Sequence, residues 1–214
     1  VKEESEAESG PGFSVFGYIL VMTTVMAVLF VSVRSIFDLF EEQKNGMLKR
    51  QAASPLPVGR IILAKLVFGV VLGAIVVALL AVIGLLFGWI ETGVDGLAAL
   101  ALTVAYSAAG CGLVAVVFGL CRNEKQAGIL SWLVVMGMSA VGGSMVPVEN
   151  MPAAMRSASE WTLNYWAIDG YKQVLFFGGG LAQIQTALLV LAGCAVVGFS
   201  LGPVSYTHLT LPTK

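Results

Sequence analysis

The sequence predicts an all-α integral membrane protein with five membrane-spanning helices. Hydrophobic residues make up 57% of the 214-residue chain and charged residues only 12%, whereas about a quarter of the residues of a soluble domain are charged. The mean hydropathy is correspondingly high, at +0.89. Five apolar segments reach or approach the roughly 20 residues that a helix needs to cross a bilayer. None of these segments carries a charged residue near its middle.

The expected spans follow one another along the chain at residues 13–33, 61–90, 97–121, 127–146 and 184–201. Two pairs of glycines in the second span have the GxxxG spacing that lets membrane helices approach closely. These pairs are Gly69/Gly73 and Gly84/Gly88. A specific dimer contact is one interpretation, and the ordinary glycine content of membrane helices is the other.

Positively charged residues lie mainly between the first and second spans and between the third and fourth. They are Arg34, Lys44, Lys49, Arg50, Arg60, Lys65, Arg122 and Lys125. The opposite side carries only Lys2, Arg156 and Lys172. The positive-inside rule therefore places the first set in the cytoplasm and residues 147–182 outside. The chain then starts outside without a signal sequence, so we expect a further span upstream of residue 1.

Residues 34–56 are expected to form an amphipathic cytoplasmic helix, here called the coupling segment. One helical face carries apolar side chains and the rest carries charges. The apolar ones are Ile36, Phe37, Phe40, Met47 and Leu48. Pro55 and Pro57 end the helix, because each disfavours the α conformation in the residue before it. The segment either presents charges to a cytoplasmic partner or lies passively at the membrane surface.

Residues 145–182, here called the external segment, favour short half-helices that re-enter the membrane. Two prolines, a modest apolar stretch and three glycines at residues 178–180 suit half-helices better than a full span. Aromatic side chains suit the head-group level of a bilayer; they include Trp161, Tyr165, Trp166 and Tyr171. The alternative is an external loop with an aromatic belt.

Signatures of catalysis and cofactor binding are absent from the sequence. It contains no G-x-x-x-x-G-K-[ST] phosphate-binding loop, no H-E-x-x-H motif and no G-x-S-x-G motif. The three cysteines have neither disulfide nor metal-site spacing, and the net charge of −1 argues against a nucleic-acid partner. We therefore expect no enzyme activity, no metal and no cofactor in this chain.

Two stretches carry a resemblance to a known family. Residues 41–56, EEQKNGMLKRQAASPL, resemble the segment between the second and third spans of type-2 ATP-binding-cassette (ABC) exporter permeases. Five positions match in order and spacing: Glu42, Gly46, Arg50, Ser54 and Pro55. Met47 and Gln51 depart from that pattern, which usually has Thr and Leu there. The external segment is also similar to this family, in Pro147 and in Met151-Pro152. Pro11-Gly12 resembles the end of its large external domain, and the resemblance covers most of residues 11–202.

The resemblance implies the membrane subunit of an ATP-driven exporter in the bacterial inner membrane. A cytoplasmic ABC ATPase subunit would hold ATP and Mg, and a second permease subunit would complete the transporter. The substrate would be hydrophobic or amphipathic. The implied ATPase-coupling residues are Glu41, Glu42, Lys44, Gly46, Lys49, Arg50, Ser54 and Pro55. The implied residues of the external re-entrant region are Pro147, Met151, Pro152, Trp161, Tyr165 and Trp166.

The expected organisation has three parts: residues 1–12 as the end of an external domain, residues 13–202 as the permease domain, and residues 203–214 as a non-native tail. The tail, PVSYTHLTLPTK, follows a completed apolar segment and has no amphipathic pattern. A gradient-driven secondary transporter or a channel-like protein is the alternative function. It predicts charged or broken helices at mid-membrane and inverted repeats, which we do not find in the sequence.

Overall fold

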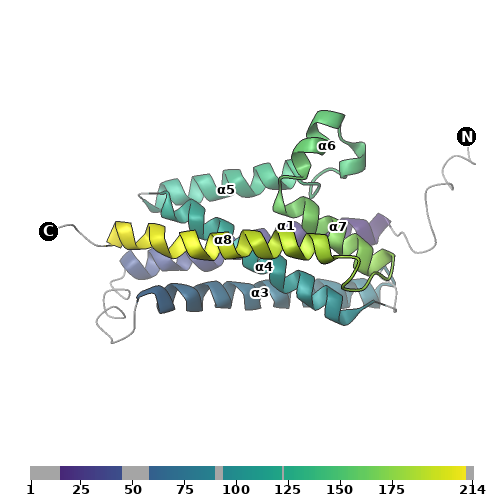
Figure 1. The fold of residues 1–214 in the computed structure, drawn as a ribbon, viewed down its shortest axis with the longest axis horizontal. Helices are drawn as coiled ribbons and strands as arrows, with labels where there is room; N and C mark the ends of the chain where they lie inside the picture. The colour runs from purple at the N-terminus through teal and green to yellow at the C-terminus, as the bar shows by residue number, and fades with distance from the viewer. Residues whose placement is uncertain (1–14, 45–57, 90–93, 122, 211–214) are drawn as a thin grey trace, which may run out of the picture.

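The computed structural model describes residues 15–44, 58–89, 94–121 and 123–210, which form seven α-helices and one short 3-10 helix. In chain order these are α1 (Val15–Lys44), α3 (Val58–Leu86), α4 (Gly96–Gly119), α5 (Glu124–Val141), η1 (Val148–Asn150), α6 (Ala153–Ser159), α7 (Leu163–Phe176) and α8 (Gln185–Thr210). The five long helices lie side by side along one axis (Figure 1). The predicted all-helical fold is confirmed for these residues, among which there is no strand.

Three helices are long and apolar enough to cross a membrane, over Val15–Ser35, Val67–Leu86 and Gly96–Gly119. Two shorter apolar stretches, Lys125–Val141 and Gln185–Leu201, lie in α5 and α8. These helices support a protein that passes through the membrane several times. The count of five spans stays a prediction, because α5 and the apolar part of α8 are shorter than the other three.

Helix α4 lies at the centre of the bundle, where it packs against α1, α3, α5, α7 and α8. In its most apolar stretch 61% of the residues are buried, compared with 17% in α3. The outer side of α3 exposes large apolar side chains, among them Val67, Phe68, Val71, Ile75 and Leu79. Such a surface suits contact with lipid, because lipid tails are as apolar as these side chains.

A tight turn after Leu86 ends α3 before residue 90, where the second expected span ends. Gly88 has φ +67°; its N–H donates to the Leu85 carbonyl at 3.1 Å, and the Trp89 N–H donates to the Gly84 carbonyl at 2.8 Å. This is the Schellman arrangement that terminates helices, and glycine suits its left-handed position. Asp95 then caps α4, its Oδ1 accepting from the Leu97 N–H at 3.0 Å.

The first GxxxG pair packs against other helices of the same chain. A Cβ added to Gly69 would lie 2.7 Å from Cys111 Sγ, and one added to Gly73 would lie 2.6 Å from Ser107 Oγ. Both neighbours belong to α4. The close approach that the sequence predicted therefore exists, but it joins α3 to α4 within the chain.

Two helices extend beyond the boundaries expected from the sequence. Helix α1 continues without a break from the first span to Lys44, so residues 34–44 are not a separate helix. The reason is local: no Gly or Pro occurs from residue 18 to residue 45. The backbone of α8 likewise remains helical through Thr210, into the expected tail. In contrast, α5 ends at Val141, before the expected residue 146.

Candidate functional site

The coupling segment begins in the last part of α1, at one end of the bundle. Here the Phe37 ring meets the Phe118 ring edge to face, with 5.6 Å between centroids. A Cβ added to Gly128 would lie 3.4 Å from the Phe37 ring. Phe37 also packs on a buried cluster from α4, α5 and the connection between them, made of Cys111, Val114, Ala115, Phe118, Cys121 and Ala127. These contacts join the end of α1 to α4 and α5.

The structure places only part of the expected ATPase-coupling set. Glu41, Glu42 and Lys44 lie in the last turns of α1, one turn beyond an ion pair of 3.3 Å between Arg34 and Asp38. The other expected coupling residues, Gly46, Lys49, Arg50, Ser54 and Pro55, lie outside the described residues. The described coupling residues therefore belong to a helical continuation of the first expected span.

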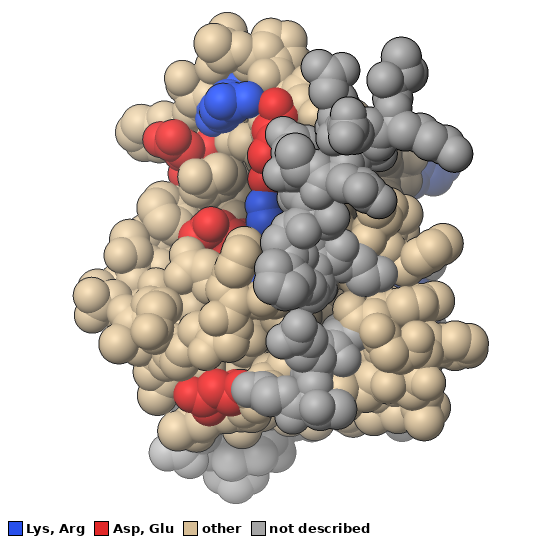
Figure 2. All heavy atoms as spheres, turned by 90° about the vertical axis from the view of Figure 1, so that its right-hand side faces the viewer, with Lys and Arg blue, Asp and Glu red and all other residues tan. Residues whose placement is uncertain are grey.

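At the opposite end of the bundle, the external segment folds into η1, α6 and α7 (Figure 1). Pro147 and Pro152 immediately precede η1 and α6, as expected for a residue with a fixed φ, and Met151 between them is buried. Charged side chains gather on the upper part of this end face (Figure 2). The expected short helices are thus present, while their depth in a membrane stays a prediction.

Three of the four aromatic residues singled out from the sequence, Trp161, Tyr165 and Trp166, lie near the start of α7, whereas the fourth, Tyr171, is buried. Trp161 is 91% exposed. The rings of Tyr165 and Trp166 are perpendicular, with centroids 5.4 Å apart. Trp166 Nε1 donates to the Glu160 carbonyl at 2.8 Å. Trp161 thus has an exposed ring, and the partly buried Trp166 has a satisfied polar edge. Both features suit aromatic side chains at a membrane surface.

Helix α7 has a buried face and a polar face. The buried face, which packs against α1, α4 and α8, includes Asn164, Ala167, Tyr171 and Val174. The polar face borders a cavity at the end of the bundle and presents Tyr165, Asp169 and Lys172. Because these two stripes follow the helical period, α7 covers this end of the bundle as a cap, with its buried face inward and its polar face on the cavity.

A buried polar network, which the sequence analysis missed, fixes this cap to the bundle. The Tyr106 hydroxyl of α4 lies 2.8 Å from the Val25 carbonyl of α1 and 3.1 Å from Asn164 Oδ1 of α7. Asn164 Nδ2 donates in turn to Ser144 Oγ at 2.8 Å and to Ser139 Oγ at 3.4 Å. In a low-dielectric interior, such a satisfied network favours one arrangement of its helices, because breaking it leaves buried polar groups unpaired.

A second link between α4 and α7 involves two hydroxyls 3.0 Å apart, those of Thr103 and Tyr171. Thr103 Oγ1 donates its proton to the Ala99 carbonyl at 2.7 Å, so Tyr171 is the donor to Thr103. The sequence does contain a signal for these contacts. Thr103, Tyr106 and Ser107 recur at helical spacing inside an otherwise apolar span, which predicts a polar stripe on one face of α4.

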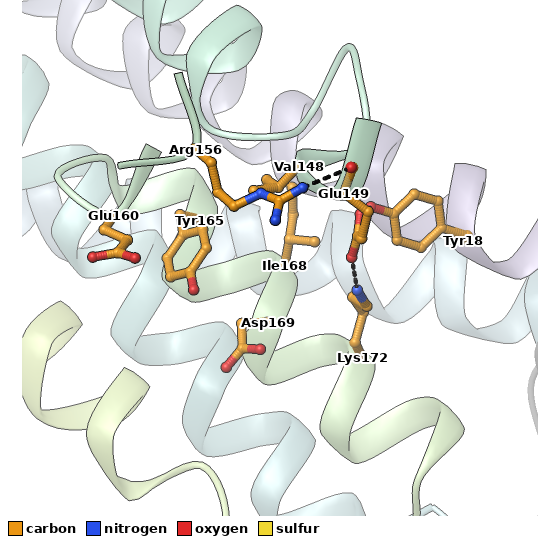
Figure 3. A pocket seen from close by; sticks show the side chains of 9 residues that line it. All are labelled: Tyr18, Val148, Glu149, Arg156, Glu160, Tyr165, Ile168, Asp169 and Lys172. Atoms are coloured by element: carbon orange, nitrogen blue, oxygen red, sulfur yellow. Dashed lines mark hydrogen bonds and ion pairs between the residues drawn. The ribbon is translucent and has the colours of Figure 1, made fainter. Parts of the chain in front are cut away.

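An ion pair at the outer surface of α7 ties η1 to both α7 and α1 (Figure 3). Lys172 Nζ pairs with Glu149 Oε1 and lies 5.3 Å from the centroid of the Tyr18 ring. The Tyr18 hydroxyl donates to Glu149 Oε2 at 3.2 Å. Burial alone would raise the pKa of Glu149, but the hydrogen bond and positive charge of Lys172 hold this pKa below its ordinary value.

The comparisons with known proteins agree with this membrane architecture. A scan against protein families matches residues 1–202 to the family described as ABC-2 family transporter protein. The matched range contains both the coupling segment and the external segment. A search for similar proteins of curated function found no match.

Proposed function

Because the chain belongs to the ABC-2 family of transporter proteins, we propose that it is the membrane-spanning subunit of an ATP-driven exporter. The family match confirms the resemblance seen in the sequence. It also implies an ABC ATPase subunit as partner, and with the apolar helices it supports a multi-pass membrane location. Export as the direction of transport, an inner-membrane location and a second permease subunit are our proposal.

The observation that carries this proposal is the continuity of α1 from Val15 to Lys44. At 1.5 Å per residue, its 30 residues extend over about 45 Å. Phe37 joins one end of α1 to α4 and α5. The Val25 carbonyl accepts from Tyr106 of α4, and Tyr18 joins the other end of α1 to η1. A force applied at the Lys44 end of α1 would therefore be transmitted to the helices at both ends of the bundle.

ATP-driven closure of the ATPase would apply this force at the coupling segment. ATP and Mg would be bound by the ATPase partner. The contact couples the two subunits only if it favours one arrangement of the helices over another. The charged coupling residues, together with Gly46, Ser54 and Pro55, are the candidates for that contact.

The proposed substrate is a hydrophobic or amphipathic molecule. A groove of about 500 Å³ between α4 and α8 is consistent with such a substrate, since its lining is almost wholly apolar. Its wall consists of Leu97, Leu100, Ala101, Val104, Ala105, Ala108, Ala192, Ala195 and Val196. The substrate would move along the interface of two permease subunits or along this lipid-facing side, and leave past the external segment.

The coupling role is tested by Glu42→Lys in vesicles that contain the permease and its ATPase partner. We expect normal membrane insertion, but weaker stimulation of ATP hydrolysis and slower efflux, because the charge at the proposed contact is reversed. Glu91→Lys is the matched control, since Glu91 lies between the second and third expected spans, which the predicted topology places outside. Wild-type efflux by Glu42→Lys would refute the coupling role. Efflux without any ATPase would favour a gradient-driven transporter.

The orientation is tested by labelling single cysteines with a membrane-impermeant maleimide on intact cells. The background lacks Cys111, Cys121 and Cys194. We expect labelling at Trp161→Cys, where the native side chain is exposed, and none at Asn45→Cys until the membrane is permeabilised. The reverse pattern would contradict the proposed orientation.

A further inference from the structure

The cavity at the outer surface of α7 has the features of a ligand-binding pocket, and we call it the charged pocket. Its volume is about 290 Å³, close to the lower limit for small-molecule sites. Four parts of the chain converge on it: α1, η1, α6 with its following turn, and α7. Its charged and phenolic lining residues are Glu149, Arg156, Glu160, Tyr165, Asp169 and Lys172.

The charges in this pocket are only partly neutralised by one another. Lys172 and Glu149 form an ion pair, and Gln173 donates to Asp169 Oδ2 at 2.9 Å. In the described part of the chain, no cation pairs with Glu160 or Asp169. The Arg156 guanidinium contacts a backbone carbonyl, that of Glu149, at 2.8 Å, and no described carboxylate. One positive and two negative groups therefore remain available to a ligand.

The available groups lie on different walls of the pocket, as Figure 3 shows. Arg156 extends from α6 toward Glu149, with part of its guanidinium free of that contact. Asp169 and Tyr165 project from α7 below it, and Glu160 precedes α7. The pKa of Tyr165 is raised by burial and then by the negative charges of Asp169, Glu160 and Glu149. That side of the pocket thus has the negative potential that attracts an ammonium group.

Neighbouring side chains favour a position for the pocket at the level of lipid head groups. Tyr18, which contributes to its wall, is in the first turn of the candidate span Val15–Ser35. The exposed Trp161 and the Tyr165–Trp166 pair lie on the same end of the bundle. Aromatic rings of this kind occupy the membrane interface.

We propose that the charged pocket binds a zwitterionic phosphoethanolamine group. Arg156 would pair with the phosphate, because a guanidinium presents several N–H donors in one plane. Glu160 and Asp169 would accept hydrogen bonds from the primary ammonium, with the Tyr165 ring against it. The group could belong to a membrane lipid or to a small soluble molecule. This inference does not rest on the proposed transport function, since binding needs neither ATP nor the ATPase.

The test uses the full chain in lipid nanodiscs made with equal amounts of phosphatidylethanolamine, phosphatidylcholine and phosphatidylglycerol. Native mass spectrometry then counts the lipids that stay bound after release from the disc. We expect preferential retention of phosphatidylethanolamine. Phosphatidylcholine should be retained less, because its quaternary ammonium has no N–H to donate. In a second arm, calorimetry with glycerophosphoethanolamine decides whether the soluble group binds without acyl chains.

Three variants locate the binding in this pocket. Arg156→Gln, and Glu160→Gln combined with Asp169→Asn, should each weaken retention of phosphatidylethanolamine about tenfold or more, because each removes charge-assisted hydrogen bonds. Asp38→Asn, at the opposite end of the bundle, should have no effect. Thermal unfolding of each variant shows whether it is folded; if the double variant is not, Glu160→Gln alone replaces it, since Glu160 is exposed.

Each outcome has a defined meaning. Lipid retention without calorimetric binding supports the proposal and identifies the ligand as a membrane lipid. Binding in both arms supports a site that recognises the head group without its acyl chains. Equal retention of the three lipids, or retention unchanged in Arg156→Gln and in the acidic variant, would overturn the proposal. Because no ATPase is present in either arm, these outcomes are independent of whether the chain transports.

Discussion

Gly112 of α4 and Gly198 of α8 bring the backbones of the two helices into direct contact. A Cβ added to Gly198 would lie 2.6 Å from the Gly112 Cα, and one added to Gly112 would lie 3.1 Å from the Gly198 Cα. In membranes, where the hydrophobic effect does not drive helices together, small residues at such crossings allow the dispersion contacts that do. The pair therefore sets the distance between the central helix and the last one.

Gly198→Ala is expected to destabilise the fold by about 1–3 kcal/mol, because the added methyl group must displace the α4 backbone. The measurement is the free energy of unfolding in mixed micelles during an SDS titration. Gly193→Ala is the matched control on the same helix, since a Cβ there meets nothing within 4 Å. Equal unfolding midpoints for the two variants would show that the crossing is less tight than described.

Asn164→Ala is expected to lower the free energy of unfolding by about 1–3 kcal/mol, because it leaves Tyr106 and Ser144 without one of their buried partners. A double-mutant cycle with Tyr106→Phe isolates the direct contact. Cycles of this kind in membrane proteins average about 0.6 kcal/mol. Ser157→Ala is the control, since its hydroxyl bonds the Ala153 carbonyl of its own exposed helix. Strictly additive single effects would rule out coupling between Tyr106 and Asn164.

The Glu149–Lys172 pair predicts a pH dependence at the outer end of the bundle. The folded state lowers the pKa of Glu149 below its ordinary value of 4.5, so the pair stabilises the fold at pH values above that. The contribution is lost as the pH falls through the lowered pKa, where Glu149 becomes protonated. It should stay below about 1 kcal/mol, since the Glu149 side chain is 58% exposed.

The measurement compares the unfolding free energy of the wild type with that of Glu149→Gln from pH 7 to pH 3. The difference should be constant down to about the ordinary pKa of Glu149 and then shrink. A difference that grows toward low pH would mean that the carboxyl is favoured in its protonated form, contrary to the ion pair.

Gly73→Val is expected to reduce stability without changing the oligomeric state, because its first side-chain atom would lie 2.6 Å from Ser107 Oγ within the same chain. Light scattering in detergent and the SDS titration give the two readouts. Gly137→Val on α5 is the control, as a Cβ there meets nothing within 4 Å. Loss of dimer with unchanged unfolding of the subunit would instead restore the dimer interpretation of the GxxxG pair.

The sequence by itself determined the helices and their approximate order. Helix length and apolarity are local properties, so residues 61–90 and 97–121 were recognisable as spans without knowledge of their neighbours. The coupling segment was recognisable as a motif. The sequence analysis treated it as a helix separate from the first span. The structure shows instead that residues 34–44 continue the helix of that span as α1.

Only the tertiary structure decided which residues meet. Tyr106 and Asn164 are 58 positions apart, and Tyr18 and Glu149 are 131 apart, so no local pattern predicts these contacts. By residue type alone, a hydroxyl or an amide in an apolar span can form hydrogen bonds with several different partners. A glycine can likewise allow the close approach of any neighbouring helix. Packing of α1, α4 and α7 at close distance brings Tyr106 and Asn164 together with the Val25 carbonyl. Their pairing stabilises this arrangement, because a polar group left unpaired inside the bundle is costly.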